Sequence, residues 1–390
     1  TLGNTGLAGQ TIAEVYEANG ASAIWSNVIK YVGAGAIATG GVISLLKSLP
    51  LIIKTFAGAM KSLKNTSGGT NVRTDRDLKM PVVLGIILIV IILIWLVPSV
   101  PVSLLGAFLI AIFGFFFATV SSRMVGLIGS SNNPVSGMAI ATLLISTFVL
   151  KATGNTGMAG MTGAIAIGSI ICVIAAIAGD TSQDLKTGFI VGATPAKQQV
   201  GELIGVVASG FAIAGVMSLL NKAWGFGSAE IPAPQATLMK MIVEGIMDAK
   251  LPWVLVFMGV FLALALEVLR VPVMPFAIGL YLPIYLSCGI MVGGVVRLFL
   301  DKKKQAEAKK KEMISNGTLY CAGMIAGEGL VGILMAVLAI IKVGDNSIGA
   351  IIGGLFNLSG AAGNIVGLIV LALMILSLLK FSVWSKTKSK

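Results

Sequence analysis

A polar stretch between two long apolar runs carries the residues best able to do chemistry. Residues 179–199 hold two aspartates, two lysines and three glutamines, whereas 152–179 and 203–221 carry no charge. Asp180 and Asp184 are four residues apart, so on a helix they share one face. Ionisable residues at membrane depth are costly and mark function by default. The stretch therefore predicts a binding site held between two membrane-crossing helices; a solvated loop is the alternative.

The end of this stretch has the features of a helix start. Thr194 suits an N-cap and Pro195 the first helical position, which predicts a helix over 195–220. Free N–H groups, the positive end of the helix dipole and the ammonium of Lys197 would together attract a carboxylate. We expect this helix start to face a polar cavity.

The two aspartates are expected to have a positive charge close by. Like charges on one helix face destabilise it, so a cation should lie near, with Lys186, Lys197 or a cationic ligand group as candidates. We expect Asp180, at the end of a span over 157–179, to be the more buried of the two and to take part in proton coupling. The residues expected to contact a polar ligand here are Asp180, Gln183, Asp184, Lys186, Lys197, Gln198 and Gln199.

Three further residues stand out. Asn133 belongs to an Asn-Pro pair, which suits a ligand-binding helix start or a plain turn. Tyr281 lies close to Pro283, where a kinked helix could line a substrate path or simply pack. Glu328 is the sole charge in its apolar run. A buried carboxylate there must be paired or protonated, which suits proton coupling, although a hydrogen-bonded structural glutamate is equally compatible.

Composition sets the fold class. The chain has 390 residues, of which 56% are hydrophobic and 11% charged, with a mean hydropathy of +0.97. These values predict an all-α polytopic transmembrane bundle of about ten spans. The expected spans are roughly 28–49, 81–97, 101–121, 134–150, 157–179, 197–220, 251–270, 275–299, 314–341 and 348–380, the last holding a short broken segment plus a full span. Residues 236–249 are expected to form an amphipathic helix along the membrane surface.

The net charge of +12 comes largely from segments that flank the apolar runs. The basic linkers 61–79 and 301–312 and the C-terminal tail are therefore expected in the cytoplasm. Seven crossings between the two linkers would put them on opposite sides, so at least one segment should be re-entrant or broken. Glu267 and Arg270, three residues apart near a helix end, are expected to form an ion pair.

Other classes of partner find little support. No aromatic residues interleave with the basic clusters, which argues against nucleic-acid binding. The chain has no histidine, and its three cysteines lie in apolar runs. We therefore expect no metal site, disulfide or cofactor. A homo-oligomer is left open.

Four strings together resemble the oligopeptide transporter family, which includes the yellow-stripe metal-chelate transporters. They are GDTSQDLKTGFIVGATPAKQQ at 179–199, SSNNPVSGM at 130–138, PFAIGLYLPIYLS at 275–287 and AGMIAGEGLVGI at 322–333. The resemblance implies secondary active uptake of peptides or metal chelates, driven by protons. We expect the protein in the plasma (inner) membrane. It also implies that residues 1–390 are one transport domain, the C-terminal portion of a longer transporter.

Two other functions remain as alternatives. A channel or a purely structural membrane protein would share this composition. An intramembrane aspartyl protease is remote, because Ile177 stands where its Gly-x-Gly-Asp motif needs glycine and no Tyr-Asp partner occurs. No P-loop precedes a helix, so ATP-driven transport is unsupported. We expect a transporter and not an enzyme.

Overall fold

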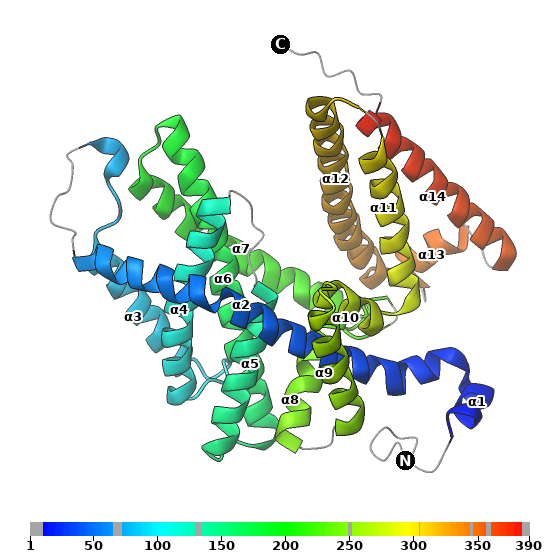
Figure 1. Ribbon diagram of the computed structural model, residues 1–390, viewed down its shortest axis with the longest axis horizontal. Helices are drawn as coiled ribbons and strands as arrows, with labels where there is room; N and C mark the ends of the chain where they lie inside the picture. Colours follow the sequence, from blue (N-terminus) through cyan, green and yellow to red (C-terminus); the bar gives the residue numbers. More distant parts are fainter. Residues whose placement is uncertain are drawn as a thin grey trace. The chain divides into compact units, whose positions relative to one another are not determined.

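The computed structural model describes residues 11–64, 72–128, 135–228, 230–248, 252–303, 305–343, 346–355 and 360–383. Within these ranges the chain is helical, apart from one short antiparallel pair of strands (Figure 1). It divides into two compact units. The first comprises residues 1–208 with 234–283, and the second comprises 209–233 with 284–390.

The first unit is built from helices that the sequence punctuates with glycine, proline and polar turns. A π-helical turn, Trp25–Ile29, joins the first two helices. Helix α7 begins in this unit and ends in the second. The helices are α1 Ile12–Ile24, α2 Lys30–Lys64, α3 Met80–Leu96, α4 Leu104–Ile128, α5 Val135–Ala152, α6 Gly157–Val191, α7 Pro195–Ala223, α8 Pro234–Asp248, α9 Trp253–Val268 and α10 Val273–Tyr281.

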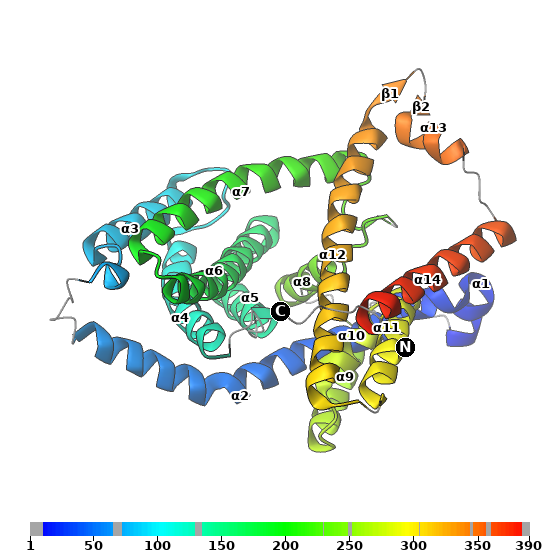
Figure 2. The same ribbon diagram turned by 90° about the horizontal axis from the view of Figure 1, so that it is seen from above.

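Helix α6 is the centre of the first unit, where it packs against α4, α5 and α8 (Figures 1 and 2). Its buried positions recur every three or four residues, as in Ala164, Ile167, Ile171 and Ala175, all at 0% exposure. This spacing presents one continuous apolar stripe to its neighbours. Small residues on the stripe allow close approach, since a Cβ added to Gly168 would lie 3.0 Å from a methyl group of Leu143 on α5.

Glycines also set the crossing of α2 with α9 and α10. A Cβ on Gly35 would collide with the carbonyl oxygen of Val256, and one on Gly259 with that of Val32. A Cβ on Gly33 would lie 2.8 Å from the backbone nitrogen of Tyr281. These helices therefore meet backbone to backbone, because glycine leaves no side chain between them.

The amphipathic helix α8 lies against protein. Its apolar residues Leu238, Ile242, Val243 and Ile246 are buried, and the helix packs on α5 and α6. Its polar face carries the Lys240–Glu244 pair, with 3.6 Å between Nζ and Oε1. The predicted amphipathic helix is confirmed. Its apolar face packs against α5 and α6, so this face meets protein and not the membrane surface. An amphipathic pattern shows that one face is buried, but it does not show what covers that face.

The second unit contains the remaining helices, α11 Ile284–Lys302, α12 Glu307–Ile340, α13 Ile348–Leu355 and α14 Gly360–Val383. Strands β1 Lys342–Val343 and β2 Asn346–Ser347 pair between α12 and α13. Helices α12 and α14 pack together through the Tyr320 ring, stacked 5.3 Å from that of Phe381. The Ser382 hydroxyl also donates to the Met313 carbonyl at 2.8 Å.

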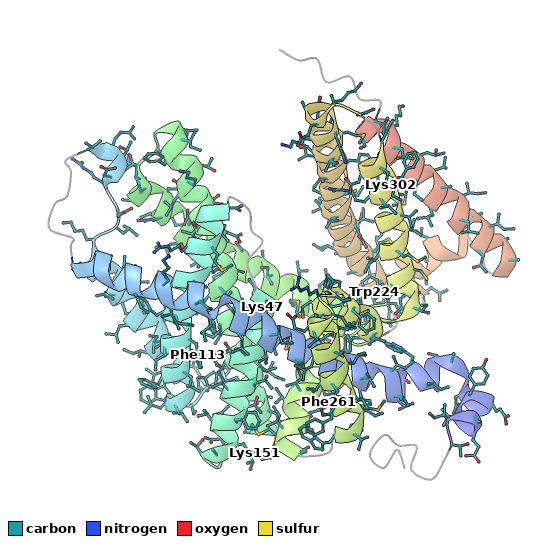
Figure 3. The ribbon with its side chains drawn as sticks, in the orientation of Figure 1. Lys47, Phe113, Lys151, Trp224, Phe261 and Lys302 are labelled. Carbon is teal, nitrogen blue, oxygen red and sulfur yellow. The ribbon has the colours of Figure 1, made fainter. Side chains whose placement is uncertain are left out.

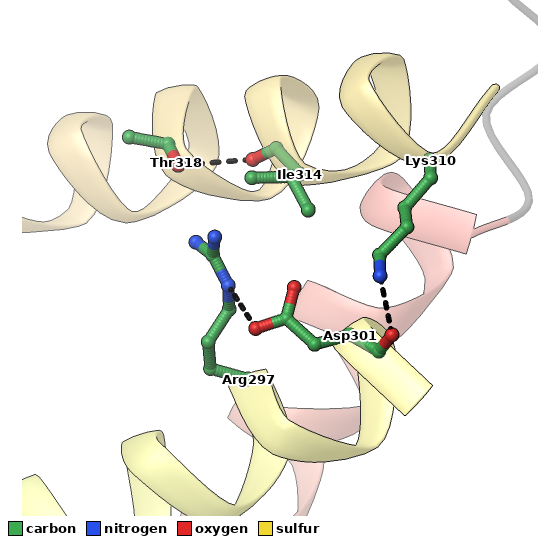
Figure 4. A network of polar contacts seen from close by, with 5 residues as sticks. All are labelled: Arg297, Asp301, Lys310, Ile314 and Thr318. Atoms are coloured by element: carbon green, nitrogen blue, oxygen red, sulfur yellow. Dashed lines mark hydrogen bonds and ion pairs between the residues drawn. The ribbon is translucent and has the colours of Figure 1, made fainter. Parts of the chain in front are cut away.

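The connection between α11 and α12 is tied by the network in Figure 4. Arg297 pairs with Asp301 one turn later on α11, with 3.1 Å between Nε and Oδ2. Lys310 of α12 donates to the Asp301 carbonyl. The predicted linker 301–312 is therefore mostly helical, and only residues 303–306 separate the two helices.

Seven helices within the described residues are long and apolar enough to cross a membrane. Two predicted breaks are confirmed, because 275–299 divides into α10 and α11 at Pro283 and 348–380 divides into α13 and α14. Two predicted ends were clearly wrong. The span predicted to end at residue 49 continues as α2 to Lys64. The span predicted to end at residue 179 continues as α6 to Val191, so most of the supposed polar loop is helix. The seven long helices are α3, α4, α6, α7, α11, α12 and α14.

The real turn between α6 and α7 is only three residues long. Gly192 adopts a φ of 73°, and its N–H donates to the Phe189 carbonyl at 3.2 Å. The N–H of Ala193 donates to the Gly188 carbonyl at 2.7 Å. This is the Schellman arrangement, in which the left-handed residue is best filled by glycine. The α6–α7 pair is therefore a tight helical hairpin.

Residues 72–79, the docking segment, bind this hairpin turn. Arg73 donates to the Thr194 hydroxyl and to the Gly192 carbonyl, both at 2.8 Å. The Ala196 N–H in the first turn of α7 donates to the Arg76 carbonyl at 2.9 Å. The N-terminus of α7 is therefore covered by protein backbone.

Gly259→Ala tests the backbone contact between α2 and α9. The added methyl group meets a backbone carbonyl, which cannot move aside cheaply, so we expect a loss of about 1–3 kcal/mol of stability. Thermal unfolding of the purified protein in detergent measures it. Gly210→Ala is the matched control, because no atom lies within 4 Å of its added Cβ. Equal melting temperatures for the two variants would contradict this packing.

Arg73→Gln tests the docking segment. Losing two hydrogen bonds from a charged donor should lower the local opening free energy by about 1–2 kcal/mol. Hydrogen exchange across residues 72–79 should accelerate, while the global melting temperature changes little. Arg76→Gln is the control, since that residue contributes its backbone carbonyl and not its side chain. If the two variants exchange at the same rate, the Arg73 side chain does not hold the segment.

Candidate functional site

The polar end of α6 carries the residues that the sequence singled out. Asp180 and Asp184 lie on α6, so the predicted one-turn spacing is confirmed, and both are exposed. Neither carboxylate is therefore buried within the described residues. Gln183 between them is half-buried. Lys186 is exposed, with its Nζ 5.5 Å from the centre of the Phe189 ring.

The start of α7 is where the sequence put it, at Pro195, and Lys197 is exposed in its first turn. The expected open cavity in front of this helix start is occupied by the docking segment, whose Arg76 carbonyl accepts the Ala196 N–H. In the described part of the chain no ion pair joins Lys186 or Lys197 to Asp180 or Asp184. The cation expected beside the aspartates is thus not supplied by these lysines.

Gln198 and Gln199 are engaged in holding the hairpin. The Gln198 side-chain amide donates to the Asp184 carbonyl, tying α7 to α6. The Gln199 side-chain oxygen accepts the Leu78 N–H at 2.9 Å, and its nitrogen lies 3.3 Å from Asp77 Oδ1. Both residues therefore have structural roles that account for their amides.

Glu202, which sequence reasoning missed, lies one turn further along α7. Its carboxylate is within hydrogen-bonding reach of Thr181 on α6 and close to the carboxylate of Asp184. One of its oxygens, Oε1, is buried without a hydrogen-bond partner. The signal was available, because Glu202 is the only charge between Lys197 and Lys222. The Asp184 carboxylate thus lies near enough to repel an ionised Glu202 across the hairpin.

Tyr281 is a core residue at 1% exposure, at the end of α10. Its hydroxyl donates to the Pro234 carbonyl at 2.8 Å. The Nζ of Lys30 lies 5.8 Å from the centres of both the Tyr281 ring and the Trp25 ring. The packing alternative that the sequence left open for Tyr281 therefore accounts for both its ring and its hydroxyl.

Two other candidates lie apart from the hairpin. Glu328 is on α12 in the second unit and is exposed, although its apolar run led us to expect burial. Asn133 falls outside the described residues. Among the residues that the structure describes, no cluster of three potential metal ligands occurs.

Two cavities with polar residues in their walls lie elsewhere in the first unit. One, of about 360 Å³, is formed by the α3–α4 connection with α5 and α6, and Asn155 contributes to its wall. The other, of about 370 Å³, lies between α2 and the α9–α10 connection. Its wall includes three charged residues, Lys47, Glu267 and Arg270, and Figure 3 marks Lys47 on α2.

Comparisons with known proteins identify one family of membrane transporters. Residues 7–339 match the model of the family described as "OPT oligopeptide transporter protein". A Haemophilus influenzae protein named "Putative oligopeptide transporter" is 31% identical over 366 residues, covering 81% of this chain and 57% of that protein. The "Probable metal-nicotianamine transporter YSL5" of Arabidopsis thaliana is 27% identical over 220 residues, covering 51% of this chain and 30% of the relative.

The chain thus spans little more than half the length of the bacterial relative and under a third of the plant one. No solved structure matches it. The family match covers most of the chain, including the α6–α7 hairpin and the helices around it. With its long apolar helices, this multi-pass integral membrane protein belongs to the OPT oligopeptide transporter family.

Proposed function

We propose that this chain is the transport domain of a proton-coupled symporter that carries short peptides or metal chelates. The observation that carries the proposal is the Asp184–Glu202 carboxylate pair, set in the hairpin of an OPT-family protein. Both helices of this hairpin are long and apolar enough to cross a membrane. Carboxylates on such helices are expensive unless they bind a proton, a cation or a ligand.

Proton coupling would use the hairpin carboxylates. Two carboxylates close together repel when both are ionised, so a state with one proton shared between them is favoured. The unpartnered Oε1 of Glu202 provides a position for that proton. Asp180, one turn before Asp184, would extend the path along α6, and Glu328 on α12 is a second candidate for proton transfer.

Cargo binding would use the exposed polar face around the same hairpin. Asp180 and Asp184 would accept an ammonium group, and Lys186 and Lys197 would meet a carboxylate. Gln183 would add an amide to this face. Asn133 and Tyr281 remain proposed contributors, the latter through its position at the break before Pro283. Gln198 and Gln199 would act chiefly by holding the hairpin that carries these side chains.

We place the protein in the plasma membrane with its basic segments in the cytoplasm. The support is the positive-inside rule applied to linkers 61–79 and 301–312 and to the C-terminal tail. Arg73, Arg76 and Lys79 of the first linker are all exposed, as are Lys302 and Lys309 near the second.

Uptake into proteoliposomes tests the transport function. The chain is reconstituted, a pH gradient is imposed, and accumulation of a labelled tripeptide or of a nickel–nicotianamine chelate is followed. We expect one of them to accumulate against its gradient only when the proton gradient is present. Gradient-independent flux would indicate a channel, and no flux of either compound into vesicles containing folded protein would reject the proposal.

Glu202→Gln tests the coupling pair. Removing the titratable group should lower gradient-driven accumulation by about 5- to 150-fold, the range of ordinary coupling free energies. Exchange of labelled for unlabelled cargo at equal pH should persist, because it needs no net proton movement. Asp184→Asn should have the same effect, and the Glu328→Gln variant asks whether the α12 carboxylate contributes separately.

Glu244→Gln is the matched control for this series, because Glu244 faces outward on α8 and pairs with Lys240. Normal accumulation by Glu202→Gln across the pH range would remove the pair from the mechanism. A parallel loss of exchange and accumulation would instead indicate damage to cargo binding.

A further inference from the structure

The cavity between α2 and the α9–α10 connection has the size and the lining of a ligand site. Its volume of about 370 Å³ falls at the lower end of small-molecule pockets, which span roughly 300–1,000 Å³. Charged residues stand on one part of the wall, namely Lys47 on α2, Glu267 in the last turn of α9, and Arg270 in the connection. The apolar wall is formed by Ile43, Val271, Val273 and Met274.

The charges on this wall do not balance. Lys47 Nζ lies 2.5 Å from Glu267 Oε1, so these two neutralise each other. The sequence predicted that Glu267 forms an ion pair with Arg270. That prediction was wrong, because Glu267 pairs with Lys47. Within the described ranges no ion pair or side-chain hydrogen bond engages the Arg270 guanidinium. The wall therefore presents one uncompensated positive charge.

Arg270 is held at a conformational cost. Its φ of 59° lies in the left-handed region, and the only other described non-glycine residue with positive φ is Ala233. A side chain in that region is disfavoured, whereas glycine adopts it freely. Strained residues cluster at ligand-binding sites, so the left-handed backbone of a residue in a pocket wall indicates a function for its side chain. Arginine offers a planar fork that matches a carboxylate.

The start of α10 adds to the positive potential. Val273 and Met274 form its first turn and also line the cavity. The first N–H groups of a helix have no partner within the helix, and its dipole is positive at that end. The Arg270 guanidinium and the start of α10 thus border an apolar space of small-molecule size, beside the neutralised Lys47–Glu267 pair. This combination suits a small anion with one carboxylate and an apolar body.

We propose that Arg270 binds a carboxylate of the transported cargo in this cavity. The Lys47–Glu267 pair fixes the wall, and the apolar residues contact the adjoining part of the ligand. This inference rests on the transport function proposed above and adds a binding subsite to it. Peptides and carboxylate-bearing metal chelates both present this group, and the experiment separates them.

Binding to the chain in lipid nanodiscs tests the subsite. The probes are Ala-Leu-Ala, its C-terminal amide, and a nickel–nicotianamine chelate, each titrated by microscale thermophoresis. For the native chain we expect the free acid to bind roughly 10- to 150-fold more tightly than the amide, the range for a hydrogen bond to a charged group. Binding of the chelate in place of the acid identifies chelate carboxylates as the source.

Arg270→Gly separates the function of the side chain from any role in folding. It should abolish the discrimination between acid and amide, or chelate binding, while the melting temperature stays level or rises as the backbone strain is relieved. Arg270→Asn, which also tolerates a left-handed backbone, repeats the test should the glycine variant fail to fold. Arg270→Lys should retain part of the preference.

Arg297→Gln is the control, because Arg297 is an exposed arginine already paired with Asp301. Persistence of the full acid preference, or of chelate binding, in Arg270→Gly or Arg270→Asn overturns the subsite and leaves the transport proposal intact. Failure of the native chain to bind any of the three probes would overturn both. If Arg270→Gly lowers the melting temperature, the acid-to-amide ratio of Arg270→Asn decides, and a ratio equal to that of the native chain overturns the subsite.

Discussion

The backbone contact of α2 with α9 and α10 is the constraint on which the first unit depends. Gly33, Gly35 and Gly259 each stand where a Cβ would strike main-chain atoms of the partner helix. At such distances dispersion forces act between whole helix backbones, and no side chain needs to be ordered first. The same contact fixes the walls of the Lys47–Glu267–Arg270 cavity, because those walls are α2 and the connection that leaves α9.

A second principle explains where the polar groups are found. Several buried hydroxyls in the helix interiors are paired with carbonyls, as when Thr142 donates to Met138 on its own helix and Ser121 to Ala175 on the neighbouring one. Such pairing removes the cost of burial. Charged groups collect instead where helices end, at the α6–α7 hairpin and at the α9–α10 connection. Glu202 departs from this pattern, since it lies inside an apolar helix with one oxygen unpartnered.

Much of the fold could be read from the sequence. The apolar runs, the Thr194–Pro195 helix start and the breaks at Pro283 and before α14 all depend on local chemistry, and the structure has them. The end of α6 could not be read in this way. Lysine and glutamine are good helix formers and aspartate is tolerated in a helix, so the polar residues after 179 marked a change of surroundings and not the end of the helix.

The site was less accessible to sequence reasoning, because its geometry depends on segments distant in the chain. Nothing in the order of residues shows that 72–79 covers the start of α7, or that Lys47 reaches Glu267 before Arg270 does. Burial was misjudged for Glu328 for the same reason, since an apolar neighbourhood along the chain does not say what surrounds a helix in space. Glu202 could have been found from the sequence, because it is the only charged residue between Lys197 and Lys222.

The docking segment combines two kinds of interaction that use different atoms. Its backbone carries part of the attachment, through the Arg76 carbonyl and the Leu78 N–H, while the Arg76 and Lys79 side chains stay exposed. Those cations remain able to meet anionic lipid head groups, an attraction worth about 1 kcal/mol for each basic residue near the surface. If these side chains face an anionic leaflet, as the proposed orientation requires, the charge of the lipid would act on the hairpin turn through the main chain.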